Sequence, residues 1–224
     1  MKKLIFIPAF LMVYSLIVSF YPIDGYERTK ISRLLYLQRE VEKGTKITRI
    51  PPGALHNLET VQLNLTQSKD KMLDDFFIQD NEFTSQLKKV IPKGAYSLTA
   101  LDMSDPNNLK YGAYKEDIGY QPGSVGKLAV LIGLFTELDK IFPGSWEEKE
   151  ALLRNKKVSS RYWGEGDHHT IPVYDVEKDK LVRRKVVGSD VFSLYEWLDH
   201  MVSVSNNGAA SVVFREALLM RQFK

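Results

Sequence analysis

Two residues near the middle of the chain have types and spacing that suit acyl transfer. Ser124 lies three positions before Lys127 in the sequence Pro-Gly-Ser-Val-Gly-Lys, so both side chains share one face if a helix begins there. Serine is a weak nucleophile, and a lysine can act as its base when loss of water or a nearby positive potential lowers the lysine pKa. The N-terminal end of a helix supplies such a potential. The spacing therefore favours a nucleophile and its base, although an N-capping serine followed by an exposed lysine is the simpler alternative.

The second motif, Ser205-Asn206-Asn207, lies between two predicted helices. Ser193 and Glu196 have the spacing of a capping box at the start of the first of these helices. The motif then forms a short connection between packed helices, from which polar side chains can point into a cleft. Ordinary turn chemistry is the alternative, because such connections are rich in serine, asparagine and glycine.

With these two motifs, the chain resembles the penicillin-recognising serine enzymes, that is, the serine β-lactamases and D-alanyl-D-alanine peptidases. Their motifs are Ser-x-x-Lys, Ser-Asp-Asn and Lys-Thr-Gly; the first occurs here at 124–127, and Ser205-Asn206-Asn207 follows in the same order as a variant of the second. By this resemblance, Ser124 would be acylated by a β-lactam or peptide carbonyl, and Lys127 would accept its proton. Ser205 would relay a proton to the leaving nitrogen, and Asn207 would bind the amide side chain of the substrate. Asn206 replaces the more familiar aspartate, which mostly supports local structure.

The resemblance implies an α/β (α+β) fold, in which a β-lactamase/transpeptidase-like sheet is flanked by helices with a helical lobe. No Lys-Thr-Gly or Lys-Ser-Gly sequence follows Ser205. In the family, that later part supplies central strands, one wall of the cleft and an oxyanion N–H. We therefore expect the C-terminal strands to be missing, with a sheet edge and apolar helix faces left open.

Two functions follow from these motifs. The first is a serine acyl-enzyme hydrolase of β-lactamase type, acting on β-lactams or related cell-wall peptides, with weak or no turnover by this truncated chain. The alternative is a non-catalytic exported envelope or binding protein that retains the front half of the fold. A third interpretation treats both motifs as helix caps in a membrane-anchored structural protein.

Residues 1–20 have the basic start and apolar run of a secretory signal. The apolar run over residues 4–20 is at the short limit for crossing a bilayer, and its cleavage point is poorly marked. It is interpreted as a signal peptide or an N-terminal anchor, with a buried helix as the alternative. We expect an exported protein, periplasmic or extracellular, that is either released or anchored.

Pattern predicts an N-terminal helical segment and linker over residues 21–93, and the resemblance implies a partial β-lactamase-like serine hydrolase domain over residues 94–224. The apolar residues that follow Lys127 lie almost all round the predicted helix, which indicates burial on several sides. Hydrophobic periodicity predicts four further elements: helices over 26–41 and 71–90, and hairpins over 96–114 and 170–187.

Composition limits the partners and cofactors. The 224 residues have a formal net charge of +3, and Lys and Arg are interspersed with Asp and Glu, which disfavours nucleic acid as a partner. There is no cysteine, so neither a disulfide nor a thiolate metal site can form. Asp167-His168-His169 is interpreted as a solvated loop, because adjacent histidines are expected to point in different directions and no third ligand is evident. We predict no metal and no cofactor.

Overall fold

The computed structural model describes residues 25–44, 77–90, 97–105 and 107–223. The predicted leader, residues 1–20, lies outside these ranges. The chain divides into two compact units, residues 1–58 with 122–224, and residues 59–121, and each is described by itself. Within the described ranges, no helix is long and apolar enough to cross a membrane.

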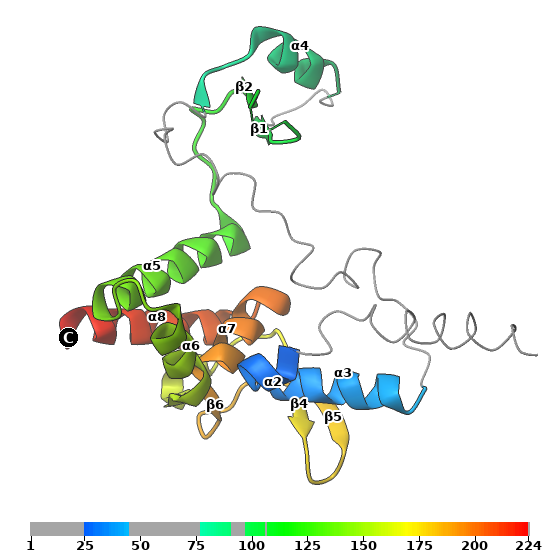
Figure 1. The fold of residues 1–224 in the computed structure, drawn as a ribbon, viewed down its shortest axis with the longest axis vertical. Helices are drawn as coiled ribbons and strands as arrows, with labels where there is room; N and C mark the ends of the chain where they lie inside the picture. Colours follow the sequence, from blue (N-terminus) through cyan, green and yellow to red (C-terminus); the bar gives the residue numbers. More distant parts are fainter. Residues whose placement is uncertain (1–24, 45–76, 91–96, 106, 224) are drawn as a thin grey trace, which may run out of the picture. The chain divides into compact units, whose positions relative to one another are not determined.

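The larger unit combines helices with short antiparallel strand pairs. Its helices are α2 (Gly25–Thr29), α3 (Ser32–Glu42), α5 (Gly126–Ile141), α6 (Trp146–Asn155), α7 (Leu194–Ser203) and α8 (Asn207–Gln222), with 3-10 turns η4 (Gly123–Val125) and η5 (Arg161–Gly164). The strand pairs are β3 (Lys157–Ser159) with β6 (Val191–Ser193), and β4 (Ile171–Asp175) with β5 (Lys180–Arg184). The hairpin predicted over 170–187 is confirmed, and α5 runs beside α8 (Figure 1).

The general α+β class is confirmed, because helices and antiparallel strands share the described part of the chain. The strands there form three separate two-stranded sheets and not one larger sheet. Each pair is short, with three to five residues on a strand. Such pairs need helices packed against them for stability.

The core of the larger unit brings α5, α7 and α8 together around Trp197. The Trp197 side chain is fully buried, and its Nε1–H donates to the carbonyl oxygen of Val158 at 2.9 Å. Other fully buried apolar residues are Leu134, Leu138, Leu153, Ile171, Leu194, Met201, Ala209, Val212 and Val213. Each buried Leu, Ile, Met or Val side chain contributes roughly 1.5–3 kcal/mol relative to exposure, so this core fixes the helices that flank the second motif.

The predicted capping box is present at the start of α7. The Ser193 hydroxyl accepts the backbone N–H of Glu196 at 3.1 Å, and the Glu196 carboxylate accepts the backbone N–H of Ser193 at 3.1 Å. The same carboxylate also accepts the backbone N–H and the hydroxyl of Ser32, at 3.2 and 2.7 Å. The cap of α7 therefore also holds the first residue of α3.

The helix predicted over 26–41 is interrupted. α2 ends at Thr29, Lys30 adopts a left-handed conformation with φ of +58°, and α3 begins at Ser32. A left-handed residue cannot continue a right-handed helix, so the periodic pattern spans two short helices. α3 ends at Glu42 and is followed by Gly44, whose φ of +72° is incompatible with a right-handed helix.

The expectation that α5 is buried on several sides is wrong. Leu134 and Leu138 are fully buried, whereas Leu128 is 51% and Ile132 is 66% exposed. α5 packs mainly on α8, so only one side of its apolar surface is covered.

The smaller unit contains α4 (Asn81–Val90) and a hairpin of β1 (Leu98–Asp102) with β2 (Lys110–Tyr114). The hairpin predicted over 96–114 is confirmed. α4 packs on β2, so it shares this unit with strands that follow the predicted boundary at residue 94. Gly112 permits this packing, because a Cβ atom there would lie 2.6 Å from Leu87 Cδ1.

The helix predicted over 71–90 begins later than expected. Residues 71–76 lie outside the described part of the chain, and α4 begins only at Asn81. The Asp80 side chain accepts the backbone N–H of Phe83 at 2.8 Å, which is the contact of an N-capping residue. Phe77 to Asp80 therefore precede the helix despite their helical periodicity.

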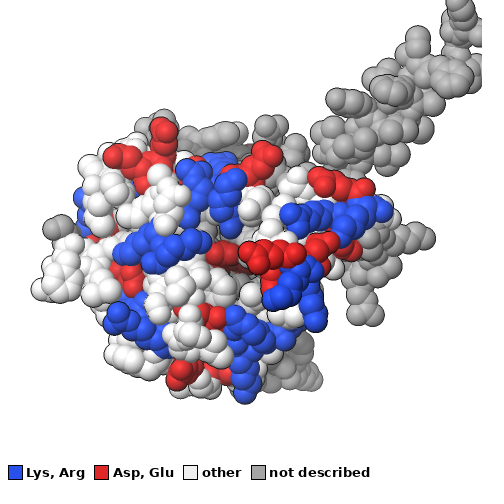
Figure 2. Space-filling model, turned by 90° about the horizontal axis from the view of Figure 1, so that it is seen from below, with Lys and Arg blue, Asp and Glu red and all other residues white. Residues whose placement is uncertain are grey.

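Positive and negative side chains are interspersed on the face of the molecule shown in Figure 2. Within the basic run 183–185, Arg184 makes a bidentate ion pair with Asp190, at 2.8 and 2.5 Å. Arg33 pairs with Asp199 in the same way, at 2.5 Å for both contacts. Such pairs use basic groups within the fold and do not leave them as one continuous positive stripe.

Candidate active site

A glycine-dependent turn leads into the first motif. Gly123 has a φ of +52°, a conformation that residues with a Cβ atom rarely adopt. The 3-10 turn η4 follows, in which the backbone N–H of Val125 donates to the carbonyl oxygen of Pro122 at 3.1 Å. α5 begins at Gly126 with no hydrogen bond from a side-chain cap. Ser124 thus lies in the turn that precedes α5, with its side chain exposed.

Lys127 joins the two motifs. It lies in the first turn of α5, and its Nζ is 3.1 Å from Ser124 Oγ. The same Nζ is 3.1 Å from Ser205 Oγ and 2.6 Å from Asn207 Oδ1. An ammonium group has three N–H donors, so these three oxygens occupy all of them. The structure therefore brings all four predicted site residues together.

Ser205 completes a triangle of polar atoms. Its Oγ–H donates to Ser124 Oγ at 2.9 Å, while its own oxygen accepts from Lys127. Ser205 has a φ of +56°, so a non-glycine residue holds a left-handed conformation at this point. Such a conformation is uncommon for residues that carry a Cβ atom. Each of the two hydroxyl groups and the amine lies within 3.1 Å of the other two.

Asn206 has a structural role between its two neighbours. Its side chain is fully buried, and Oδ1 accepts the backbone N–H of Ala209 at 2.7 Å as the N-cap of α8. Its Nδ2–H donates to the carbonyl oxygen of His169 at 2.9 Å. Its backbone N–H donates to the carbonyl oxygen of His200 at 3.1 Å. The middle residue of the motif therefore anchors the connection between α7 and α8.

Gly208 allows α8 to begin close against η5. It is buried, and a Cβ atom at this position would lie 2.2 Å from the carbonyl oxygen of Gly164. That approach is far shorter than a van der Waals contact, so a side chain does not fit here without backbone movement. The start of α8, and with it Asn207, is held by backbone packing.

Asp167 is a residue of the site that the sequence analysis did not assign. Its side chain is only 4% exposed. One carboxylate oxygen, Oδ2, accepts the backbone N–H of Asn207 at 2.5 Å, and the other, Oδ1, accepts the Asn207 side-chain Nδ2–H at 3.2 Å. With Nδ2 held by the carboxylate, Oδ1 of Asn207 points to Lys127. Asp167 is thus a positioning residue for Asn207.

The charge of Asp167 is stabilised by N–H donors. Partial burial by itself would raise the pKa of this carboxyl group, but hydrogen bonds from His169 and from the backbone N–H of Asn207 hold the pKa well below its usual range. Asp167 also lies at the N-terminal end of α8, where the helix dipole favours a negative charge. It is therefore an ionised carboxylate at neutral pH.

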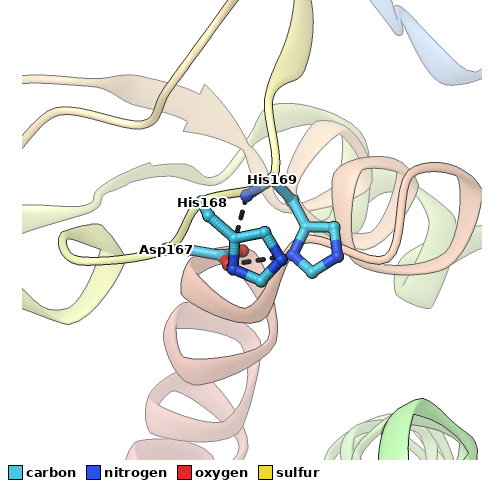
Figure 3. A group of neighbouring side chains, drawn as sticks. All are labelled: Asp167, His168 and His169. Atoms are coloured by element: carbon cyan, nitrogen blue, oxygen red, sulfur yellow. Dashed lines mark hydrogen bonds and ion pairs between the residues drawn. The ribbon is translucent and has the colours of Figure 1, made fainter.

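The expectation that His168 and His169 point in different directions is wrong. Their ring centroids are 4.0 Å apart, and the Nδ1 atoms lie 3.5 and 2.9 Å from the same oxygen, Oδ1 of Asp167 (Figure 3). Oδ1 also accepts the backbone N–H of His169 at 3.3 Å, which closes a turn of the Asx type. This local turn brings the two rings to one side, a result that the residue order alone does not reveal.

The arrangement can support one chemical step directly. For Ser124 to attack a carbonyl carbon, its hydroxyl proton must leave as the new bond forms, and Lys127 Nζ or Ser205 Oγ lies within hydrogen-bonding distance to receive it. Lys127 must be in its neutral amine form to accept that proton. Because Ser124 is exposed, a substrate can reach its oxygen from solvent.

Comparison of the chain with protein-family models, with curated proteins and with solved structures finds no match.

Proposed function

We propose that this protein is a serine acyl-enzyme hydrolase that acts on β-lactams or related cell-wall peptides in the periplasm or outside the cell. One observation carries the proposal: Ser124 Oγ, Lys127 Nζ and Ser205 Oγ lie within 3.1 Å of one another, although Ser205 follows Lys127 by 78 positions. Two unrelated helix caps have no reason to bring a hydroxyl, an amine and a second hydroxyl to one point.

In the proposed acylation step, the Ser124 oxygen forms a bond with the substrate carbonyl carbon, and its proton passes to neutral Lys127. The carbon–nitrogen bond of the β-lactam or peptide then breaks. The proton moves from Lys127 through Ser205 to the leaving nitrogen, which restores the neutral amine. Asn207, held by Asp167, binds the amide side chain of the substrate with its own amide group.

The position of Ser124 and Lys127 at the N-terminal end of α5 supports this assignment. α5 has 16 residues, and the aligned peptide dipoles of such a helix place a partial positive charge at its start. That charge would stabilise the negative charge that develops on the substrate oxygen during attack. The fold thus provides at this site the positive potential that the sequence motif requires.

The β-lactamase/transpeptidase-like fold is also a proposal. Its support is the packing of α5 against α8, together with the contacts that bring Ser124 and Lys127 near the start of α5 to Ser205 and Asn207 near the start of α8. We propose that α5, α7 and α8 form the helical lobe of such a fold. The short strand pairs of the described residues do not build its central sheet.

The test is intact-mass spectrometry of the exported chain after incubation with a labelled penicillin. We expect one adduct on the wild type and none on Ser124→Ala, since only the Ser124 oxygen can form the ester. Ser189→Ala, which removes an exposed serine away from the site, is the matched control and should still form the adduct. Absence of any adduct on a folded sample, as shown by circular dichroism, would favour the non-catalytic exported envelope or binding protein.

We further propose that turnover is weak relative to acylation. The Lys-Thr-Gly sequence that resemblance to the family calls for does not occur between Ser205 and Lys224. Acylation needs the nucleophile and the proton path, which the described residues bring together, so it is the step to measure first. Efficient hydrolysis of a chromogenic cephalosporin that is lost in Ser124→Ala would contradict weak turnover and support the enzyme.

A further inference from the structure

Three side chains next to the candidate active site place metal-ligand atoms close together. The Nδ1 atoms of His168 and His169 lie 3.5 and 2.9 Å from Oδ1 of Asp167, and ligand atoms of all three residues lie within 4.8 Å of one another (Figure 3). A tetrahedral zinc ion with bonds of about 2.0–2.2 Å holds its ligand atoms roughly 3.3–3.5 Å apart. The three residues therefore need only small shifts to surround one ion.

The charge at this place also suits a cation. The Asp167 side chain is 4% exposed, and within the described part of the chain its ion pairs are with His168 and His169 only. Lysine and arginine, which carry a fixed charge, do not pair with it there. The N–H donors around Asp167 keep its charge but do not neutralise it, so the carboxylate can still attract a divalent cation. The 81% exposure of the His168 side chain gives an ion access from solvent.

We propose that Asp167, His168 and His169 form a binding site for a zinc ion, with a fourth coordination position open to water. Oδ1 of Asp167 and the Nδ1 atoms of the two histidines are the ligands. Two imidazoles with one carboxylate suit zinc, whereas magnesium and calcium prefer sites made of oxygen atoms. Zinc is not redox active, so the proposal involves no electron transfer.

Zinc at this site would act on Asn207 through Asp167. Oδ1 of Asp167 is the atom that accepts Asn207 Nδ2–H at 3.2 Å, whereas Oδ2 accepts the backbone N–H of Asn207. An ion on Oδ1 competes with the Asn207 amide for that oxygen but leaves the backbone contact in place. The amide then loses one of the two contacts that orient it toward Lys127. Zinc would therefore slow acylation, a consequence that rests on the proposed function.

Binding is tested by isothermal titration of the full chain without an affinity tag, using zinc chloride, with magnesium chloride as the ion control. We expect one zinc ion per chain, no response to magnesium, and an affinity at least about tenfold weaker for His168→Ala and for His169→Ala. Asp175→Asn, which neutralises a solvent-accessible carboxylate in the β4–β5 hairpin, should bind zinc as the wild type does. His168→Ala is the decisive variant, since an exposed side chain can be removed without loss of fold. No zinc binding by folded wild type, or unchanged affinity in both histidine variants, would overturn the site.

The link to Asn207 has its own measurement. Cobalt substitution gives an absorption spectrum that reports tetrahedral ligation without any reaction, and penicillin adduct formation with and without zinc reports the consequence. At a zinc concentration that saturates the wild type and leaves His168→Ala largely unbound, we expect zinc to slow adduct formation by the wild type but not by His168→Ala. Equal rates with and without bound zinc would overturn the link. If no adduct forms even without zinc, the proposed hydrolase fails, while the calorimetry and the cobalt spectrum still decide the metal site.

Discussion

The two halves of the candidate site are held in place in different ways. The Ser205–Asn207 connection is fixed from within: Asn206 is fully buried, Gly208 packs against the backbone of Gly164, and Asp167 holds Asn207. The Ser124 turn has no side-chain cap, and Leu128 and Ile132 on the following helix are more than half exposed. The contacts of Lys127 connect the second half to the first.

Because of this difference, substitutions in one half of the site should affect stability, and substitutions in the other half should affect the reaction. Residues that hold the α7–α8 connection belong to the core, so their replacement should unfold the protein before it alters a reaction. Residues at the start of α5 contribute little buried surface, so their replacement should alter the reaction and leave the fold intact. The expected effects below test this separation.

The largest effect is expected for Lys127→Met, which keeps the length of the side chain but removes the amine. A positioned base contributes about 100- to 10,000-fold to rate, so adduct formation with labelled penicillin should slow by that factor. The free energy of unfolding, measured in urea, should change by less than about 1 kcal/mol. Lys140→Met at the other end of α5 is the control and should react at the wild-type rate. An equally fast Lys127→Met would remove lysine from the mechanism.

Gly208→Ala tests how tightly the start of α8 is packed. Because the added carbon would lie 2.2 Å from the Gly164 carbonyl oxygen, we expect the free energy of unfolding to fall by about 3 kcal/mol. Gly133→Ala on α5 is the matched change, since a Cβ atom there meets nothing within 4 Å. It should raise stability by about 0.5–1 kcal/mol, because alanine favours the helix. Equal effects at the two positions would show that the halves are packed alike.

Acid should lower the free energy of unfolding through His200, which lies on α7, the helix before the Ser205–Asn207 connection, and is 3% exposed. Burial lowers the pKa of His200 from 6.5 to about 4. Below pH 6.5 the unfolded chain takes up a proton that the folded chain refuses, so stability should fall by about 3 kcal/mol between pH 7 and pH 4. Urea unfolding at several pH values measures this slope. His200→Phe should have a flatter slope, and an unchanged slope would assign the loss to other groups.

Asn206→Asp gives the smallest expected loss. The aspartate keeps the oxygen that caps α8 but cannot donate to the carbonyl oxygen of His169, so we expect a loss of about 2 kcal/mol in the free energy of unfolding. Asn108→Asp, at an exposed turn of the smaller unit, makes the same chemical change and should have little effect. A loss no larger than that of the control would mean that the Nδ2 contact contributes nothing.

Local features of the fold were predictable from the sequence. The capping box of Ser193 and Glu196 and both hairpins depend on residues close together in the chain, and the structure contains all three. The reach of Lys127 to Ser124 also follows from helical spacing. The start of α4 was not predicted, because the Asp80 cap competes with the apolar period that precedes it.

Features that depend on distant contacts were not predictable. Asp167 lies 40 positions before Asn207, and nothing in its local pattern signals that contact. The buried role of Asn206 depends likewise on the carbonyl oxygen of His169, 37 positions earlier. The exposure of α5 depends on which helices pack against it, and this packing cannot be predicted from its apolar composition. Periodicity describes one element at a time, whereas these features arise between elements.

The left-handed backbone of Ser205 restricts which residue types can replace it. Threonine carries the same hydroxyl group, but its branched Cβ atom is strongly disfavoured at a φ of +56°. Glycine, asparagine and aspartate accept that backbone but lack the hydroxyl. Among aliphatic hydroxyl residues, serine alone satisfies both demands, so a saturation library at position 205 should separate variants that fold from variants that react.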